Sequence, residues 1–330
     1  MIEPFNPRRS KRGTWAPQPE TVALLRVSGN SINGVGETSA HRTSPFFWHP
    51  PDQHRWDELQ LLARKNSRKC PGSTEAFQGA YTYPELISVA ETRDESPPRD
   101  LAEAVKSFAL SHEADDVGIA IMDPVYVFEG YSIDHPWVII LAIAHNYERL
   151  RDVPSDETNG LGVCDVGDQY VRGTWSSYAL AWWLRSQGYH ADPYPGPMAG
   201  ALLLIPPAIS AGLGELGKHG SLISPRFGSG VRLAGVTTDM PLIPTAPIHF
   251  GADEFCTTCQ ICTRACPPGA IAPNKQMVRG VELWYVDSDK CISYFAEAAS
   301  CGICIADGPW TRPSVRPKLL ANMARRVDKE

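Results

Sequence analysis

The residues best suited to chemistry are cysteines near the carboxyl end of the chain. Cys256, Cys259, Cys262 and Cys266 follow the spacing C-x₂-C-x₂-C-x₃-C, and Pro267 comes directly after them. With this spacing three thiolates converge on one iron–sulfur cluster, while the fourth reaches a second cluster. The run therefore predicts a pair of clusters and requires further cysteines downstream.

Three more cysteines follow at suitable positions. Cys291, Cys301 and Cys304 complete a four-thiolate set with Cys266 and predict one fully cysteine-ligated 4Fe-4S cluster. The first set has only three evident ligands, because Gly308 stands where the two-cluster pattern calls for another cysteine. We expect that site to hold a 3Fe-4S cluster, or a 4Fe-4S cluster with a ligand other than thiolate.

The fourth ligand of the first set stays open at this point. Asp307 is one residue from Gly308, and Cys70 and Cys164 are the two cysteines outside the clusters. The simplest interpretation makes Cys70 and Cys164 reduced thiols without a role. Zinc also binds C-x₂-C pairs, but four cysteines at these spacings plus a further triplet favour iron and sulfur over zinc or disulfides.

Composition narrows the choice of partners and compartment. The 330 residues carry a formal charge of −6, with scattered Lys and Arg, so we expect no nucleic acid partner. No apolar run approaches the roughly 20 residues of a membrane span. Arg8-Arg9 could begin an export signal, but no apolar segment follows. The sequence therefore predicts a cytoplasmic protein.

The chain changes character several times. Its beginning is rich in Pro, Arg, Ser and His, with one plausible helix near residues 56–65, and its middle alternates helical and strand-like patterns. We therefore predict an α/β protein of the α+β type, a core of helices and strands beside a small two-cluster iron–sulfur domain. The expected segments are an irregular arm (1–95), the α/β core (96–245), the iron–sulfur domain (246–310) and a tail (311–330).

Periodicity predicts the elements of the core. A helix should begin near Asp100, and the apolar runs 117–122 and 137–144 predict buried strands. Residues 165–187 predict a second helix with an aromatic stripe that favours core packing over a cofactor contact. The run ALLLI at 201–205 predicts a short strand.

The segment after that run is rich in glycine. Gly212, Gly214 and Gly217 spell G-x-G-x-x-G, but a dinucleotide fingerprint needs a helix to open there, and Gly220 and Pro225 would break it. A glycine-rich loop can nevertheless let the backbone approach a large flat ligand.

In this segment the sequence resembles the reductive dehalogenases, which are cobalamin-dependent iron–sulfur enzymes, and more distantly the epoxyqueuosine reductases. The matching stretches are GLGELGKHGSLISPRFGSGVRLAGVTTDMPLIP, FCTTCQICTRACPPGAI, RGVELWYVDSDKC and SCGICIADGPW. The resemblance extends over about residues 100–310. It implies a corrinoid-binding α+β core with a mixed sheet that holds base-off cobalamin. It also implies a ferredoxin-like domain whose two clusters carry electrons to the cobalamin.

The resemblance also implies cofactor contacts in the glycine-rich segment. The residues predicted to contact cobalamin are Gly212, Leu213, Gly214, Lys218, His219, Gly220, Ser221, Ser224 and Phe227.

The family's proton donor is a tyrosine that lies 19 residues before the Tyr of an L-G-Y motif. Here the motif is QGY with Tyr189, which points to Tyr170, with Tyr178 as the substitute. The family's arginine that favours the tyrosinate matches Arg232. If Asp168 caps the helix, the positive helix end would favour the tyrosinate too.

One family feature has no counterpart. An Asn or Lys follows L-G-Y and helps position the tyrosine or the substrate, but counting places Gly196 there. His190 is a possible replacement.

The predicted function is reductive dehalogenation of an organohalide, with an external ferredoxin or flavoprotein as electron donor. One alternative is a related corrinoid iron–sulfur reductase that acts on a non-halogenated substrate. The other is a ferredoxin-type electron-transfer protein without a corrinoid.

Overall fold

A computed structural model describes residues 15–25, 27–45, 57–196 and 200–327. Arg8, Arg9 and Trp56, which entered the sequence predictions, lie outside these ranges. The strands are β1 (Asp116–Ile121), β2 (Trp137–Ala144), β3 (Ala191–Tyr194), β4 (Glu215–Leu216), β5 (Leu222–Ile223), β6 (Val231–Thr238), β7 (Gln276–Val278) and β8 (Val281–Leu283).

The helices come before, between and after these strands. They are α1 (Pro19–Leu24), α2 (Gly29–Ile32), α3 (Asp57–Ser67), α4 (Ser73–Ala76), α5 (Pro98–Ser111), the 3₁₀ turn η2 (Pro124–Tyr126), α6 (Tyr147–Leu150), α7 (Leu161–Ser186), α8 (Ile205–Ser210), α9 (Ala252–Thr258), α10 (Ile261–Ala265), α11 (Ser288–Glu297), α12 (Ile303–Asp307) and α13 (Arg316–Val327).

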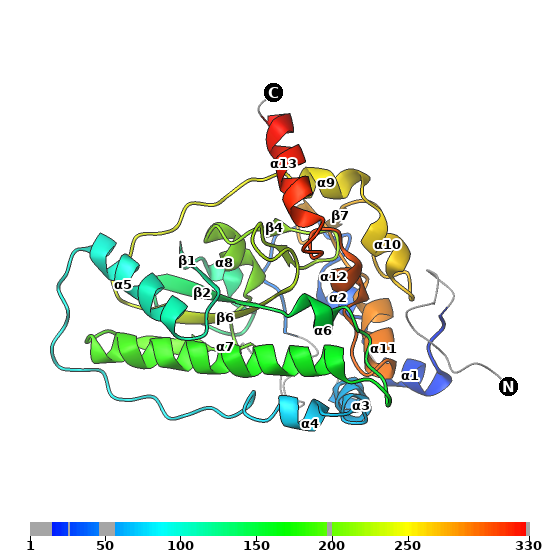
Figure 1. Cartoon of the computed structure of the whole chain (residues 1–330), viewed down its shortest axis with the longest axis horizontal. Coiled ribbons are helices and arrows are strands. Elements are labelled where there is room, and N and C mark those ends of the chain that lie inside the picture. The colour runs from blue at the N-terminus through cyan, green and yellow to red at the C-terminus, as the bar shows by residue number, and fades with distance from the viewer. Residues whose placement is uncertain (1–14, 26, 46–56, 197–199, 328–330) are drawn as a thin grey trace.

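A four-stranded antiparallel sheet in the order β1-β2-β6-β3 forms the centre of the α/β part. Strand β2 is buried along almost its whole length because both faces are covered. Helices α5 and α7 pack on one face, where Ile139, Leu141 and Ile143 point, and α8 packs on the other. Figure 1 shows α7 running the length of the sheet. The predicted α/β fold class is confirmed in this coarse form. The predicted mixed sheet is wrong, because all three strand pairs of this sheet are antiparallel.

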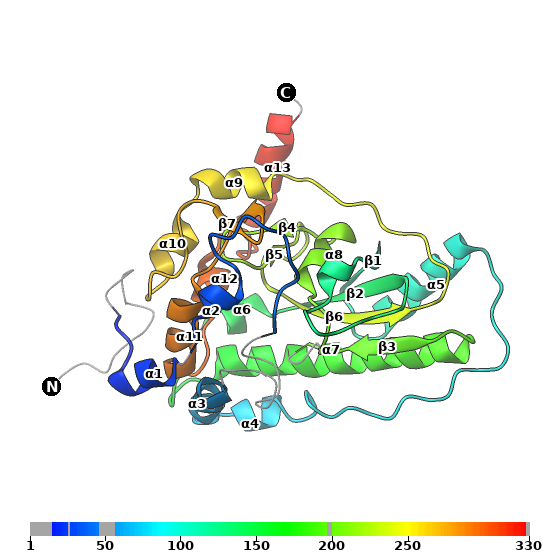
Figure 2. The same cartoon turned by 180° about the vertical axis from the view of Figure 1, so that it is seen from behind.

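The cysteine-bearing helices α9 to α12 gather beyond one end of the sheet (Figures 1 and 2). The amino-terminal segment packs against them. Ser28 Oγ and the Gly29 amide donate to the Asp289 carboxylate, which lies in the first turn of α11. The predicted arm therefore covers the helix that carries Cys291. The predicted domain boundaries stay predictions.

Several sequence expectations need correction. The run 201–205 is not a strand, because Pro206 and Pro207 occupy the first turn of α8, where proline is favoured. Helix α7 begins at Leu161 rather than at residue 165. Within the aromatic stripe Tyr178 is buried, while Trp175 is 47% exposed.

Candidate active site and cysteine clusters

Tyr170 and Arg232 meet between α7 and β6. Arg232 Nη1 donates to Tyr170 Oη at 3.0 Å, and its guanidinium carbon lies 4.4 Å from the centre of the ring. Helix α7 can approach the sheet here because a Cβ at Gly173 would lie only 3.5 Å from that of Ala234. The ring of Phe77 lies 5.9 Å away and completes the packing of Tyr170.

Arg232 has no other strong partner among the described residues. None of their ion pairs includes Arg232, and its Nε is buried without a hydrogen-bond partner. Its charge is therefore available to the phenol oxygen. The guanidinium therefore holds the Tyr170 hydroxyl in a fixed position, as a positioned general acid requires.

The expected helix cap is wrong. Tyr170 is the tenth residue of α7, and Gly160 precedes the first turn. Asp168 lies inside the helix and pairs with Arg149 at 2.7 Å. The helix extends further back because Gly162 allows close contact with Val153. Arg232, and not a helix end, is thus the positive group next to Tyr170.

Gly196 lies against the tyrosine ring. A Cβ at this position would stand 3.1 Å from Tyr170 Cδ1 and 2.9 Å from the carbonyl oxygen of Leu233. Gly196 therefore lies beside Tyr170 and offers it no side chain. His190 does not replace it, because its backbone pairs with Asp239 near the opposite end of β6.

Tyr178, the substitute proton donor, lies elsewhere on α7. Its ring stacks on Tyr83 at 6.1 Å, and burial raises the pKa of its phenol. A phenol with a raised pKa is a poorer proton donor. The geometry favours Tyr170.

A buried His–Asp pair flanks this site, and sequence reasoning missed it. His145 Nδ1 lies 2.6 Å from Asp165 Oδ2, with 3% and 0% of the side chains exposed. Burial, and then the charges of Arg232 and Arg172, lower the pKa of His145 despite the carboxylate. Because the neutral imidazole donates to Asp165, that carboxylate is occupied. Arg232 therefore remains available to Tyr170.

The cysteines lie in two overlapping groups, and Cys262 belongs to both of them. Cys256, Cys259 and Cys262 line one cavity together with Gly308 and Trp310. Burial raises the pKa of Cys256 to about 12, and the backbone N–H and the charge of Lys218 oppose that rise. An isolated Cys256 thiol would stay protonated, so iron binding is what would turn it into a thiolate.

The second set packs around α11 and α12. Cys266 and Cys262 contact Cys291 and Cys304 in one apolar group with Ala270 and Ile271. Burial raises the pKa of Cys291, Cys301 and Cys304, and each thiol also feels the charge of Cys266. Among the described residues no group of three or more His, Cys, Asp or Glu is arranged to hold a single metal ion.

Orphaned polar atoms lie beside both sets. The indole N–H of Trp310 and the hydroxyl of Tyr294 are buried without hydrogen-bond partners in the described structure. Trp310 lines the cavity of the first set, and the charges of Cys301 and Cys266 act on Tyr294. Cluster sulfur accepts hydrogen bonds. The residues present therefore fit iron–sulfur clusters.

Gly308 leaves the first set one ligand short. Asp307 is exposed and does not line the cavity. Cys70 and Cys164 pack with Val163 and Phe77, away from this cavity. His219 lines the cavity, yet Ser221 N donates to its Nδ1 and its Nε2 lies 2.7 Å from Ser229 Oγ. Each sequence-proposed fourth ligand is thus outside the cavity.

The predicted cobalamin contacts differ in accessibility. Leu213, Gly214, Lys218 and Ser224 are buried by the protein itself, and a Cβ at Gly214 would lie 2.2 Å from the Ile223 carbonyl oxygen. The first glycines thus serve the β4–β5 hairpin, and no helix opens at them. Only part of the set fits a corrinoid. Those that keep accessible surface are Gly212, His219, Gly220, Ser221 and Phe227.

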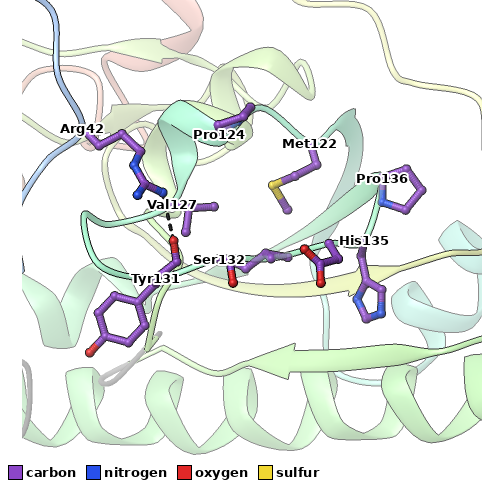
Figure 3. Close-up of a pocket in the computed structure, with 10 residues that line it drawn as sticks. Arg42, Met122, Pro124, Val127, Tyr131, Ser132, His135 and Pro136 are labelled. Carbon is purple, nitrogen blue, oxygen red and sulfur yellow. Dashed lines mark hydrogen bonds between the residues drawn. The ribbon is translucent and has the colours of Figure 1, made fainter.

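A separate cavity of about 430 Å³ opens in the loop before β2 (Figure 3). Arg42 Nη1 donates to the Tyr131 carbonyl oxygen across it, and Met122, Val127 and Ile133 supply apolar wall. None of the sequence-predicted site residues lines it. His135, which lines this cavity, forms a hydrogen bond with Thr237. Thr237 is five residues along β6 from Arg232, so the two residues are about 16 Å apart.

Comparison with known proteins confirms the resemblance. No family model matches the chain. It is 34% identical over 187 residues to a tetrachloroethene reductive dehalogenase of Sulfurospirillum multivorans, covering 54% of this chain and 36% of the relative. A tetrachloroethene reductive dehalogenase of Desulfitobacterium hafniense is 34% identical over 203 residues, which is 58% of this chain and 36% of that protein.

A weaker sequence relative is the epoxyqueuosine reductase of Leadbetterella byssophila, 39% identical over 87 residues, 26% of this chain and 24% of that protein. A solved reductive dehalogenase, described as suggesting a mechanism for B12-dependent dehalogenation, shares the fold with a TM-score of 0.69 and 24% identity. The alignment covers 95% of this chain and 49% of that structure. The chain is thus similar to reductive dehalogenases but spans about a third to a half of their length.

Within the described residues, no helix combines the length and the apolar character that crossing a bilayer requires.

Proposed function

We propose that the chain is a cobalamin-dependent iron–sulfur reductase that removes halogen from an organohalide. The observation that carries the proposal is the pairing of Tyr170 with Arg232 at 3.0 Å, in a chain similar to reductive dehalogenases that also gathers two cysteine sets.

The overall reaction replaces the halogen with hydrogen. It consumes two electrons and one proton and releases halide. When bound, cobalamin supplies a reduced cobalt that is a strong nucleophile towards carbon–halogen bonds. The accessible members of the predicted contact set, Gly212, His219, Gly220, Ser221 and Phe227, are the ones we assign to it.

Tyr170 holds the proton at its Oη. Arg232 stabilises the phenolate left after transfer, because its guanidinium is both hydrogen-bonded to Oη and placed over the ring. Gly196 lies so close to the ring that a Cβ there would stand 3.1 Å from Tyr170 Cδ1, so its lack of a side chain permits this position of the ring. Solvent then returns the proton to Tyr170.

The cysteine sets carry the electrons. Cys266, Cys291, Cys301 and Cys304 hold a 4Fe-4S cluster, and Cys256, Cys259 and Cys262 hold the incompletely ligated cluster. An external ferredoxin or flavoprotein supplies the electrons.

The test is anaerobic reconstitution with iron, sulfide and cobalamin, followed by a halide-release assay with a chemical reductant. Base-off absorption, bound cobalt and released halide are the expected results. Iron uptake without cobalt would indicate an electron-transfer protein instead. Cobalt uptake without halide release from a panel of organohalides would point to a corrinoid reductase for a different substrate.

A further inference from the structure

Lys218 is a fully buried cation. Its side chain is 1% exposed, and its Nζ donates to the carbonyl oxygen of Cys259 at 2.9 Å. The ammonium also lies 4.8 Å from the centre of the Trp284 ring. A buried ammonium is unfavourable unless negative charge compensates it.

The described protein supplies no such charge. No described carboxylate lies within ion-pairing distance of Lys218. Two acidic groups in this region are already engaged: Asp253 pairs with Lys275 and accepts from Trp284, and Glu215 accepts from the backbone of Ala252. The compensating charge must therefore come from something held in the neighbouring cavity.

That cavity is the one lined by three cysteines. Lys218 bonds to the backbone of Cys259 and directly precedes His219, and both Cys259 and His219 line the cavity with Cys256 and Cys262. A cluster held by three thiolates is anionic, and each electron that it accepts adds a negative charge. The buried ammonium lies where it would stabilise that charge.

Among the described residues, the charged groups that act on Cys291, Cys301 and Cys304 are other cysteines together with Asp287 and Asp307. Lys218 is not one of them, so its charge acts on the first set and not on these three ligands.

We infer that Lys218 is the charge partner of the cluster held by Cys256, Cys259 and Cys262, and that it raises the reduction potential of this cluster. Lys218 acts as a positioning residue for electrons and not as a cobalamin contact. The inference rests on the proposed iron–sulfur function and adds a determinant of how electrons distribute between the clusters.

The chain offers a matched control. Lys275 Nζ also lies over the Trp284 ring, at 5.4 Å, but it is partly exposed and Asp253 neutralises it at 2.7 Å. Lys275→Gln also removes a lysine from this aromatic ring, but it does not remove a buried charge.

The experiment is a potentiometric titration of the reconstituted full chain, followed by electron paramagnetic resonance, for Lys218→Gln, Lys218→Met, Lys218→Arg and Lys275→Gln. Gln keeps a donor for the Cys259 carbonyl, whereas Met does not. At a fixed potential, both uncharged Lys218 variants should lower the reduced-to-oxidised ratio of the three-cysteine cluster by about tenfold to a hundredfold. The other cluster, the Arg variant and the Lys275 variant should stay near wild type.

If the three-cysteine cluster titrates unchanged in the Gln and Met variants, the inference about Lys218 is wrong, although the proposed clusters stand. Equal shifts of both clusters would also contradict the inference. Loss of only the three-cysteine cluster in both uncharged variants, with retention in the Arg variant, would support the same role. Loss of this cluster in the Arg variant as well would show that the shape of the side chain at position 218 matters and its charge does not, which would contradict the inference. Wild-type protein that takes up no iron would overturn the proposed clusters and, with them, this inference.

Discussion

Arg232 contacts Tyr170 in two ways, by a 3.0 Å hydrogen bond to Oη and by placing its guanidinium carbon 4.4 Å from the ring centre. The two residues are 62 positions apart and come from a strand and a helix that pack face to face. The contact keeps both the oxygen and the ring in one orientation. It therefore defines where a proton would be delivered.

Tyr170→Phe should abolish turnover while cobalt and iron contents stay near wild type. The ring packing against Phe77 and Gly196 is retained, so only the proton and its hydrogen bond are lost. A positioned general acid contributes roughly 10² to 10⁴ in rate. Halide release by the reconstituted protein measures the effect.

Tyr178→Phe is the matched control for that variant. It removes a phenol from the same helix at a position stacked on Tyr83. It should retain most of the activity. An active Tyr170→Phe protein beside an inactive Tyr178→Phe protein would reverse the assignment.

Gly196→Ala should lower activity without loss of either cofactor. The added Cβ would approach the Tyr170 ring to 3.1 Å and the Leu233 carbonyl oxygen to 2.9 Å, so the ring must shift from Arg232. Gly200→Ala is a suitable comparison for the added methyl, because nothing lies within 4 Å of its Cβ, although its positive φ makes some strain unavoidable. Equal kcat in Gly196→Ala and wild type would show that the close packing is unimportant.

The sequence predicted some of these features for identifiable reasons. Strands β1 and β2 were predicted because they are continuous apolar runs, and the cysteine sets because thiolate spacing is specific. Strand β6 was missed, since Arg232 and Gly235 interrupt its apolar pattern within a glycine-rich segment. Tyr170 was predicted from the family's 19-residue offset, and Arg232 from its match to the family's arginine. No local sequence pattern shows which strand faces which helix.

The His145–Asp165 pair was beyond sequence reasoning. The two residues are 20 positions apart, and neither belongs to a motif. The Asp168 cap failed because tertiary packing at Gly162 and Gly167 extends α7 through polar residues that would otherwise favour a helix start.

His145 makes the stability of the protein depend on pH. Its pKa is lowered in the native state by burial and by Arg232 and Arg172, with Asp165 opposing the shift, whereas in the unfolded chain it is about 6.5. As the pH falls below about 6.5, His145 binds a proton in the unfolded chain but not in the native state. Stability contributed by this residue is therefore present above pH 6.5 and declines on acidification towards the lowered native pKa.

His145→Gln should reduce the difference in unfolding free energy between pH 8 and pH 5.5, measured by urea titration. Gln keeps a donor near Asp165 but cannot be protonated. His190→Gln, at an exposed position whose imidazole has no ion pair among the described residues, serves as the control for the loss of a histidine. A pH dependence in His145→Gln equal to that of wild type would contradict the prediction.

Gly308→Cys should stabilise the cluster held by Cys256, Cys259 and Cys262. Gly308 has φ −56° and ψ 132°, which any residue adopts, and it lines the cavity of these cysteines. A Cβ there would lie 3.2 Å from the Cys304 carbonyl oxygen and 3.3 Å from that of Ile305, so shifts of a few tenths of an ångström would admit it. The new thiolate would supply the fourth ligand that Asp307, Cys70 and Cys164 are not placed to give.

The measurement is iron content and electron paramagnetic resonance after oxidative challenge, with Gly308→Ala as the control that adds a Cβ without a thiol. The Cys variant should hold about eight irons per chain, while wild type and the Ala variant should lose iron from the three-cysteine site first. Oxidised wild type should give a three-iron signal, or reduced wild type the signal of a four-iron cluster with a ligand other than thiolate. Two all-cysteine four-iron clusters in wild type would mean that Cys70 or Cys164 moves to complete the set, and that Gly308 does not leave a ligand missing.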